Sequence, residues 1–288
     1  DRVIASVKDS GLRGMGGAGF PTGVKWGFVR DQDSTEKYLV CNADESEPGT
    51  FKDRVILADL PHLVIEGMVL AGLSVGAEKG IVFIRHEYLP ERDILAAELE
   101  RARQLGVVGD DVLGSGRRFE LSITVSPGGY ILGEETALLE CLEDQRGEPR
   151  NKPPYPGERG LWGKPTLINN VETLAFVPLI VNEGAEAWQA RGEGDFAGLK
   201  FIALSGDVER PEVYEVPMGT TISALIERAG GMKNGQRLYA IAPGGASSNF
   251  IPASGADLAL DFEALREAGT MLGSGAVLVV AEGRDVMD

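Results

Sequence analysis

Residues 37–49 read KYLVCNADESEPG, an apolar run that passes directly into a polar, turn-forming segment. Residues 37–41 predict a short strand and residues 42–49 a loop. In open α/β sheets, ligands bind in loops that follow the carboxyl ends of the strands. Asn42 offers a donor and an acceptor, while Asp44, Glu45 and Glu47 can accept from ring N–H groups, ribose hydroxyls or a carboxamide. The loop is therefore a candidate ligand site; the alternative is a solvated acidic turn, and a metal site is disfavoured.

Helical and strand patterns alternate farther along the chain. Apolar spacing predicts helices over 62–73, 91–105 and 134–143, and buried strands over 80–85 and 119–125. This alternation indicates βαβ units on a largely parallel sheet. Leu138, Cys141 and Leu142 form one apolar stripe of the third helix, so Cys141 is expected in the core. Residues 147–165 predict an extended surface loop that ends at Asn169 and Asn170, before a helix over 171–182.

The character of the chain changes around residues 192–198. Short strands over 200–205, 213–216 and 238–242 surround one helix over 222–229, with Thr220 or Thr221 as its N-cap. A strand pair, one helix and later strands are typical of a β-grasp arrangement. We therefore expect a Rossmann-like α/β domain with a largely parallel sheet over 1–197, followed by a ubiquitin-like β-grasp α+β domain over 198–288.

Composition narrows the class of protein. The chain has 288 residues, 43% of them hydrophobic, which is enough for a sizeable core. A formal charge of −16 repels phosphate backbones, so we expect no nucleic-acid partner. No apolar run reaches the roughly 18 residues of a membrane span, so we expect no direct membrane insertion. The only cysteines and histidines are Cys41, Cys141, His62 and His86, whose spacing suits no metal site; we expect reduced, cytoplasmic cysteines.

A glycine-rich loop over residues 11–19 is the second candidate site. Gly14, Gly16 and Gly19 match GxGxxG, but the dinucleotide fingerprint follows a strand and opens a helix. Here a predicted helix over 2–10 precedes the loop, and Pro21 disfavours a helical residue 20. We therefore reject a Rossmann fingerprint, and the loop also lacks the Lys-Ser/Thr pair of a phosphate-binding loop. The remaining readings are a phosphate cradle of bare backbone N–H groups or a flexible turn.

The residues after this loop favour the cradle. Lys25 could pair with a phosphate. Phe20, Trp26 and Phe28 bracket that lysine, and an adenine or flavin ring could stack on such aromatics. Taken alone, such aromatics more often belong to an ordinary core.

Two further clusters precede predicted helices. In residues 128–136, GGYILGEET, Gly133 allows close backbone approach and Glu134 and Glu135 stand at a helix start. A carboxylate that accepts from both hydroxyls of a ribose would also repel a 2′-phosphate and select NAD over NADP; the alternative is simple stabilisation of the helix dipole. In residues 166–173, TLINNVET, Asn169 and Asn170 could cap the next helix or donate to a phosphate.

These segments together resemble a known family. In this order, GLRGMGGAGFPTGVKW (11–26), CNADESEPGTFKDR (41–54), YILGEETALLE (130–140) and GLWGKPTLINNVET (160–173) closely resemble the flavin-binding subunit of respiratory complex I. The same module serves NAD-dependent formate dehydrogenases and NAD-reducing hydrogenases. The resemblance covers essentially the whole chain and includes the β-grasp part, which it implies to be of SLBB type.

The resemblance assigns roles to individual residues. It implies that FMN lies among Gly14, Gly16, Gly17, Lys25, Asn42, Asp44, Tyr130, Gly133 and Glu134, with Ile168, Asn169 and Asn170 at its phosphate end. It implies that the nicotinamide of NADH stacks on the flavin near Glu47, and that Glu135 holds a ribose. The adenine would lie between Phe20, Phe28 and Tyr155. No side chain need act as acid or base, because hydride transfer is the cofactors' own chemistry.

The implied function is that of an NADH dehydrogenase flavoprotein subunit. Hydride would pass between NAD(H) and FMN, and electrons would leave singly to iron–sulfur clusters. The alternatives are the diaphorase or beta subunit of a formate dehydrogenase or hydrogenase and, in another class, a non-catalytic scaffold whose β-grasp part docks partners. Expected partners are a thioredoxin-like 2Fe–2S subunit and an iron–sulfur relay subunit. The expected location is the cytoplasm, or the cytoplasmic face of the inner membrane through those partners.

The chain departs from the family pattern at several positions. Met15 stands where complex I has Arg, which removes a positive charge, and Leu132 replaces a Cys beside the flavin. Residues 127–129, PGG, replace a Gly-Ala-Gly-Ala-like approach. The family continues after a segment like 276–288 into a helical bundle whose four cysteines hold a 4Fe–4S cluster. We expect this chain to be part of a longer one, with that cluster beyond Asp288 or on another chain.

Overall fold

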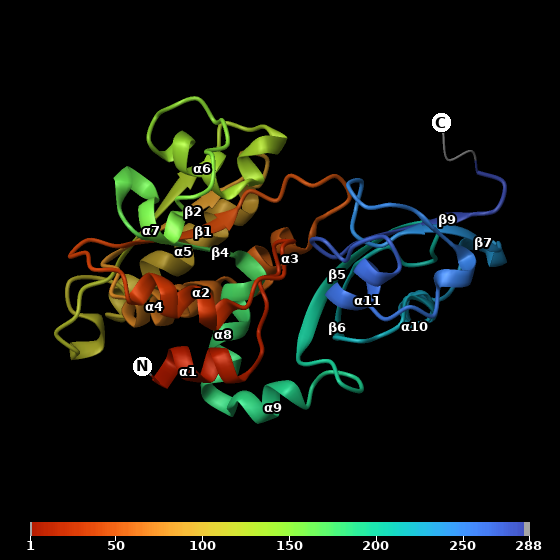
Figure 1. Cartoon of the computed structure of the whole chain (residues 1–288), viewed down its shortest axis with the longest axis horizontal. Helices are drawn as coiled ribbons and strands as arrows, with labels where there is room; N and C mark the ends of the chain where they lie inside the picture. Colours follow the sequence, from red (N-terminus) through yellow and green to blue (C-terminus); the bar gives the residue numbers. More distant parts are fainter. Residues whose placement is uncertain (1, 285–288) are drawn as a thin grey trace. The chain divides into compact units, whose positions relative to one another are not determined.

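The computed structural model describes residues 2–284, which form two compact units (Figure 1). The first unit contains the chain up to residue 16 together with 20–46 and 53–185. The second contains 17–19, 47–52 and the chain from 186 onward. Residues 1 and 285–288, which the predicted domain ranges include, lie outside the described residues. The ranges 1–197 and 198–288 stay predictions.

A parallel four-stranded sheet with the order β3-β2-β1-β4 forms the centre of the first unit. Its strands are β1 (Tyr38–Ala43), β2 (Lys79–Ile84), β3 (Glu120–Val125) and β4 (Thr166–Asn170). Asn42 of β1 lies opposite Phe83 of β2 and Asn170 of β4. The predicted parallel sheet is confirmed, and the carboxyl ends of its strands share one edge.

Helices cover both faces of this sheet, as burial of parallel strands requires. On one face, Val40 and Phe83 share an apolar cluster with Leu138 of α6, and Cys141 packs partly buried against it. On the other face, α4 and α8 cross so closely that a Cβ on Gly67 would lie 2.0 Å from the carbonyl oxygen of Leu174. The helices are α1 (Arg2–Asp9), α2 (Thr22–Arg30), α3 (Lys52–Asp59), α4 (Pro61–Val75), α5 (Leu89–Gln104), α6 (Glu135–Leu142), α7 (Pro156–Arg159) and α8 (Val171–Glu183). The helices predicted over 62–73, 91–105, 134–143 and 171–182 are confirmed.

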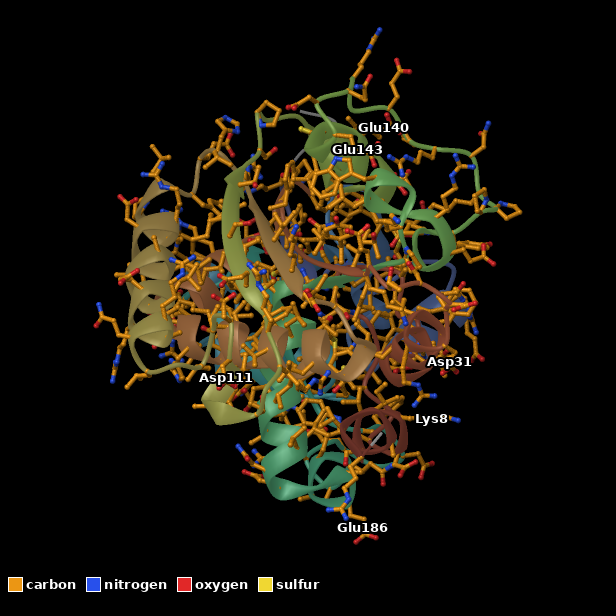
Figure 2. The ribbon with its side chains drawn as sticks, turned by 90° about the vertical axis from the view of Figure 1, so that its left-hand side faces the viewer. Lys8, Asp31, Asp111, Glu140, Glu143 and Glu186 are labelled. Carbon is orange, nitrogen blue, oxygen red and sulfur yellow. The ribbon has the colours of Figure 1, made fainter. Side chains whose placement is uncertain are left out.

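The surface of the first unit is charged. Figure 2 shows Lys8, Asp31 and Asp111 at its periphery, and all three are exposed. The charged side chains are therefore in contact with solvent, and the apolar side chains fill the two layers around the sheet.

Residues 147–170 differ most from the prediction. The predicted surface loop contains the short helix α7, and β4 follows it where the sequence predicted no strand. β4 is short and ends in two asparagines, a residue type that strands disfavour. Its pairing with β1 aligns Val40 with Ile168, and this pairing across the sheet determines the strand.

A mixed five-stranded sheet with the order β6-β5-β9-β7-β8 forms the second unit. β5 (Leu199–Gly206) pairs parallel with β9 (Ala276–Ala281) and antiparallel with β6 (Val213–Pro217), while β7 (Leu238–Ala242) pairs antiparallel with β9 and with β8 (Ile251–Pro252). The unit also contains α10 (Ile222–Arg228) and α11 (Phe262–Glu267), and from Glu186 onward it includes α9 (Ala185–Gln189). Neither α9 nor α11 was predicted. Thr221 caps α10, because its hydroxyl accepts the backbone N–H of Ala224 at 3.2 Å. The predicted β-grasp type of fold is confirmed.

Within residues 2–284, no single helix is long and apolar enough to cross a membrane. The helices α3 and α4 reach that length and apolar composition only together, and they meet at a 94° bend. The described residues also hold no group of three or more His, Cys, Asp and Glu side chains arranged to bind a metal ion.

Candidate functional site

The acidic loop over residues 42–49 and the GGYILGEET segment over residues 128–136 meet at the carboxyl edge of the parallel sheet. The Asn42 side-chain amide donates to the carbonyl oxygen of Gly133 at 2.9 Å. Asp44 follows β1 and accepts the hydroxyl of Ser126, the residue after β3, at 2.7 Å. It also accepts the hydroxyl of Ser46. A Cβ on Gly133 would lie 3.3 Å from the carbonyl oxygen of Asp44, so a side chain there would press on the loop.

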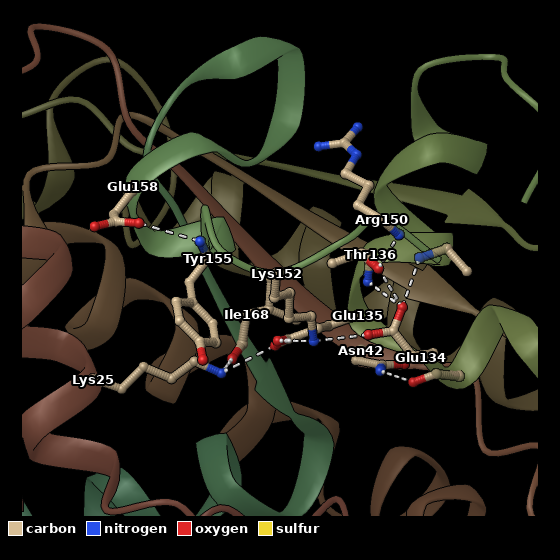
Figure 3. A network of polar contacts seen from close by, with 12 residues as sticks. Lys25, Asn42, Glu134, Glu135, Thr136, Arg150, Lys152, Tyr155, Glu158 and Ile168 are labelled. Atoms are coloured by element: carbon tan, nitrogen blue, oxygen red, sulfur yellow. Dashed lines mark hydrogen bonds and ion pairs between the residues drawn. The ribbon is translucent and has the colours of Figure 1, made fainter. Parts of the chain in front are cut away.

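Two lysines and two glutamates form a charged network beside this edge (Figure 3). Lys152 donates to Glu134 and to Glu135, each at 2.9 Å. Lys25, from α2, donates to Glu135 at 3.4 Å and to the carbonyl oxygen of Ile168, on β4, at 2.8 Å. Glu135 therefore lies between two ammonium groups, and its side chain keeps 26% of its surface exposed.

The network shifts the ionisation of its members. Burial raises the pKa of Glu135, but the charges and hydrogen bonds of Lys25 and Lys152 outweigh burial, so its pKa lies below the usual value. Burial likewise raises the pKa of Glu134, and donation from Thr136, Lys152 and Ala137 brings the net pKa below the usual value. Burial lowers the pKa of Lys152, and its bonds to the two glutamates raise it overall. All three groups are charged at neutral pH.

The two glutamates have different local roles. Glu134 is the N-cap of α6, because one of its carboxylate oxygens accepts the backbone N–H groups of Thr136 at 2.8 Å and Ala137 at 3.0 Å. Glu135, in the first turn, makes no such contact with the helix start and faces the lysines. The helix-start interpretation therefore accounts for Glu134 and leaves Glu135 as the candidate ligand carboxylate.

The two asparagines at the end of β4 hold neighbouring elements. The Asn169 side-chain oxygen accepts the indole N–H of Trp26 at 2.8 Å. Asn170 caps α8 through the backbone N–H of Glu172 at 2.9 Å, and its amide donates to Asp53 at 2.6 Å. The capping interpretation is confirmed for Asn170.

The glycine-rich loop connects two helices, α1 and α2. The Gly14 N–H donates to the carbonyl oxygen of Phe20 at 2.9 Å, which closes the loop at its base. A Cβ on Gly16 would lie 3.1 Å from the Asn170 Cβ, so the loop backbone passes directly over the end of β4. Gly17 belongs to the second compact unit and has φ +134°, a conformation that favours glycine. The rejection of a strand–loop–helix fingerprint is confirmed.

The aromatic residues around this loop divide into two groups. Trp26 is fully buried and belongs to the core. Phe20, Phe28, Tyr130 and Tyr155 are each more than 40% exposed, which is unusual for such large apolar rings. A Cβ on Gly157 of α7 would lie 2.9 Å from the Phe28 ring, so α7 brings its N-cap residue Tyr155 toward α2. Figure 3 shows the Tyr155 side chain directed toward Lys25.

Glu45 and Glu47 are held by other partners. The Glu45 carboxylate accepts the backbone N–H groups of Asp53 at 2.9 Å and Arg54 at 3.2 Å, and the Tyr88 hydroxyl at 2.9 Å. Burial and the neighbouring Glu45 charge raise the pKa of Tyr88, which keeps the phenol protonated as a donor. Glu47 belongs to the second unit and accepts from Ser247 there.

Comparison with known proteins then identifies the family. Residues 7–179 match the family described as the Nuo51 FMN-binding domain, and residues 201–250 match the SLBB domain. The chain belongs to the Nuo51 FMN-binding domain family. It is 43% identical over 282 residues to the NADH-quinone oxidoreductase subunit designated F in Salmonella typhimurium, covering 97% of this chain but 63% of that relative. The NADH-quinone oxidoreductase subunit designated F 2 in Rhizobium meliloti is 47% identical, with 97% of this chain and 67% of that protein covered.

Solved structures agree with this assignment. An NAD⁺-reducing [NiFe]-hydrogenase in its H₂-reduced state matches with a TM-score of 0.89 and 40% identity, over 98% of this chain and 47% of that one. The same hydrogenase type in the air-oxidized state matches with a TM-score of 0.85. The chain therefore spans about half to two thirds of the length of these relatives.

The residues at the carboxyl edge of the parallel sheet supply hydrogen-bond donors that fit a flavin nucleotide. The Asn42 amide can address the alternating donors and acceptors of a flavin edge, and Lys25 can pair with a phosphate. Gly128 and Gly129 have φ +96° and +130°, so this turn exposes backbone without side chains. A Cβ on Gly128 would lie 2.5 Å from the His86 ring, which excludes larger residues.

Two residues that depart from the family pattern are buried. Leu132 belongs to the apolar cluster with Leu138, and a Cβ on Gly147 would lie 2.4 Å from its side chain. Met15 is 2% exposed, and its backbone N–H donates to the Thr173 hydroxyl at 2.9 Å. Both side chains therefore contribute packing.

Lys152 and Ser126 are site residues that the sequence did not reveal. Lys152 lies in the Pro-rich stretch predicted as a plain surface loop, and nearby Arg150 anchors that stretch on α6. The Arg150 N–H donates to the Thr136 hydroxyl at 2.8 Å, and its guanidinium pairs with Glu140 of α6 and with Glu143, the C-cap residue of that helix, both labelled in Figure 2. Ser126 follows a predicted strand, and the carboxyl-edge rule could have identified it.

Proposed function

We propose that the chain is the FMN- and NAD(H)-binding part of an NADH:acceptor oxidoreductase and transfers hydride between nicotinamide and FMN. The observation that carries the proposal is the network in which Glu135 lies between Lys25 and Lys152, beside Asn42, at the carboxyl edge of a parallel sheet. Membership of the Nuo51 FMN-binding domain family supports it independently. Bound FMN would supply a hydride acceptor that can release electrons one at a time.

The proposed flavin residues supply backbone groups, amide side chains, two carboxylates and one ammonium group. Asn42 and the turn before α6 would receive the flavin ring, with Asp44 orienting its N–H edge and Glu134 acting as the cap of α6. Lys25 would neutralise phosphate charge next to the end of β4. The residues proposed to hold FMN are Gly14, Gly16, Gly17, Lys25, Asn42, Asp44, Tyr130, Gly133, Ile168, Asn169 and Asn170, together with Glu134, which would act through the turn that it caps.

The proposed dinucleotide residues supply charge selection and stacking. Glu135 would accept from the adenosine ribose hydroxyls and repel the 2′-phosphate of NADPH. The exposed rings of Phe20, Phe28 and Tyr155 would stack on adenine. Glu47 would accept from the nicotinamide carboxamide. Glu45 was predicted as a ligand residue, and its hydrogen bonds favour a structural role in the same loop.

The side chains would position the cofactors and take no part in proton transfer. Hydride transfer would be the chemistry of the two cofactors, so the protein would contribute orientation and exclusion of water. The protonation states agree with this division, because Glu134 and Glu135 stay deprotonated and Lys152 stays protonated around pH 7.

The parent complex has two candidates with support. The NADH-quinone oxidoreductase relatives favour an enzyme of complex I type. The hydrogenase structures favour the diaphorase subunit of an NAD⁺-reducing hydrogenase. The beta subunit of an NAD-dependent formate dehydrogenase is a third member of the same class. In each case the chain would pass electrons to iron–sulfur clusters, among them a 4Fe–4S cluster and the 2Fe–2S cluster of a thioredoxin-like subunit. The complex would lie in the cytoplasm or on the cytoplasmic side of a membrane.

Flavin spectroscopy tests this proposal. Purified protein incubated with FMN and desalted should retain a yellow flavin spectrum, and NADH added without oxygen should bleach it. ADP-ribose, which lacks nicotinamide, is the matched control and should leave the colour unchanged. A protein that binds no FMN, or whose FMN is not bleached by NADH, is better described as a non-catalytic scaffold.

A further inference from the structure

The turn between β7 and β8 in the second unit is built to bind a carboxylate. Its residues are 244–248, GGASS. The Ser248 hydroxyl accepts the N–H of Gly244 at 3.1 Å and donates to the carbonyl oxygen of Gly245 at 2.8 Å, which fixes the turn from within. The Ser247 N–H and hydroxyl are thereby presented together to one acceptor.

The carboxylate bound there is that of Glu47. One oxygen of Glu47 accepts the Ser247 N–H at 2.8 Å and the Ser247 hydroxyl at 2.7 Å, and the hydroxyl also lies 2.8 Å from the other oxygen. A Cβ on Gly245 would lie 3.0 Å from the Glu47 carboxylate, and Gly245 has φ +88°. The turn therefore requires glycine for both its conformation and the approach of Glu47.

A second contact holds the same segment. The hydroxyls of Thr50 and Ser274 lie 2.6 Å apart, so residues 47–52 are attached to the second unit at both Glu47 and Thr50. Glu47 is thus held by Ser247, a residue two hundred positions away in the sequence.

We infer that Ser247 is the positioning residue for Glu47 in dinucleotide binding. The inference rests on the proposed function, in which Glu47 accepts from the carboxamide. A carboxylate fixed by two donors on one side is held in one rotamer and presents its oxygens in a defined direction. Loss of the Ser247 hydroxyl frees the Glu47 rotamer and weakens binding of ligands that carry nicotinamide.

The test compares NAD⁺ with ADP-ribose by titration calorimetry on the full chain. Ser247→Ala should weaken NAD⁺ binding on the order of tenfold, the size of one charge-assisted hydrogen bond, and leave ADP-ribose binding within about twofold. Ser247→Thr, which keeps the hydroxyl, should bind as wild type does. Ser223→Ala is the matched control, because Ser223 donates to Asp257 at 2.9 Å on the surface of the same unit.

A double-mutant cycle separates positioning from general stability. With Glu47→Ala already present, Ser247→Ala should cause no further loss of NAD⁺ affinity. Gly245→Ala, which displaces the Glu47 carboxylate while keeping Ser247, should show the same nicotinamide-specific loss. In the FMN-loaded protein, Ser247→Ala should raise the KM for NADH with little change in kcat.

Several results would overturn the inference. Equal loss of NAD⁺ and ADP-ribose affinity would show a general structural effect, and unchanged NAD⁺ affinity in Ser247→Ala would remove the role. Additive losses of NAD⁺ affinity from Glu47→Ala and Ser247→Ala would show that Ser247 does not act through Glu47. If NADH does not bleach the FMN bound to the wild-type protein, both the proposed function and this inference are overturned. If NADH bleaches it and the Ser247→Ala and Gly245→Ala variants bind NAD⁺ as the wild type does, the inference alone is overturned.

Discussion

Two adjacent acidic pairs, Asp44–Glu45 after β1 and Glu134–Glu135 at the start of α6, look alike in sequence and are used differently. In each pair one carboxylate caps a helix: Glu45 accepts the first N–H groups of α3, and Glu134 those of α6. The other member is held by side chains, hydroxyls for Asp44 and ammonium groups for Glu135.

The difference teaches which carboxylates are available to a ligand. Helix amides stay in place when a ligand arrives, so a capping carboxylate remains committed to the fold. Lysine ammonium groups have several donors and a flexible stem, so they can hold Glu135 and still accommodate a ligand. The following experiments test this division, from the largest expected effect to the smallest.

Glu45→Ala should cost the most stability. The substitution leaves the α3 N–H groups and the buried Tyr88 hydroxyl without their acceptor, which should lower the free energy of unfolding by about 3 kcal/mol. Urea unfolding measures the change. The matched control is Glu158→Ala, because Glu158 is an exposed glutamate of α7 that accepts the backbone N–H of the N-cap residue Tyr155 at 3.2 Å, with an expected cost of about 0.5 kcal/mol. Similar losses of unfolding free energy for the two variants would contradict the structural role assigned to the Glu45 carboxylate.

Lys25→Ala should weaken cofactor binding. It removes one of the two ammonium groups beside Glu135 and the donor to the Ile168 carbonyl, so FMN or NADH affinity should fall by about tenfold or more. Equilibrium titration followed by flavin fluorescence gives both affinities. Lys79→Ala, at the exposed start of β2, serves as the control and should bind normally. Unaltered affinity for both ligands would remove Lys25 from the site.

Glu135→Gln should relax the selection against NADPH. Without the negative charge, the 2′-phosphate is no longer repelled, so the ratio of kcat/KM for NADH to that for NADPH should fall about tenfold. Steady-state kinetics with an artificial electron acceptor measures the ratio. Glu148→Gln, an exposed acid in the loop before Lys152, should leave it unchanged. Unchanged discrimination in Glu135→Gln would disprove the ribose assignment.

Glu134→Gln should show a small, pH-dependent loss of stability. The folded-state pKa of Glu134 lies below the usual value of 4.5, so its stabilisation is present above pH 4.5 and is lost as pH falls through the lower folded-state pKa. We expect a cost of about 1 kcal/mol at pH 7 that shrinks below about pH 4. Urea unfolding of the wild type and the variant at pH 7 and below about pH 4 tests this. A difference in unfolding free energy that grows in acid would contradict it.

The strand–helix order of the first unit was predictable because local periodicity expresses it. β4 was not, since its five residues include two asparagines and gain their strand conformation from pairing with β1. The β-grasp strands and the cap at Thr221 were predictable, whereas α11 was too short to show a pattern.

The candidate site was predictable to the level of its loops. The carboxyl-edge rule correctly brought the Asn42 loop and the Gly133 turn together. The different roles of Glu45 and Glu135 were not predictable, because they depend on distant residues. Tyr88, which donates to Glu45, is 43 residues away, and Lys152, which pairs with Glu135, lies in a stretch that Arg150 anchors. Such long-range hydrogen bonds leave no local pattern in the sequence.

The composition of the second compact unit limits how genes of this type can recombine. Residues 17–19 and 47–52 belong to that unit although they are encoded within the first, and a Cβ on Gly19 would lie 2.8 Å from the Phe262 ring. A foreign β-grasp module fused after residue 185 would arrive without partners shaped for these two segments. Exchange of either half alone therefore carries a penalty, and the two halves are expected to be inherited and to diverge as a pair.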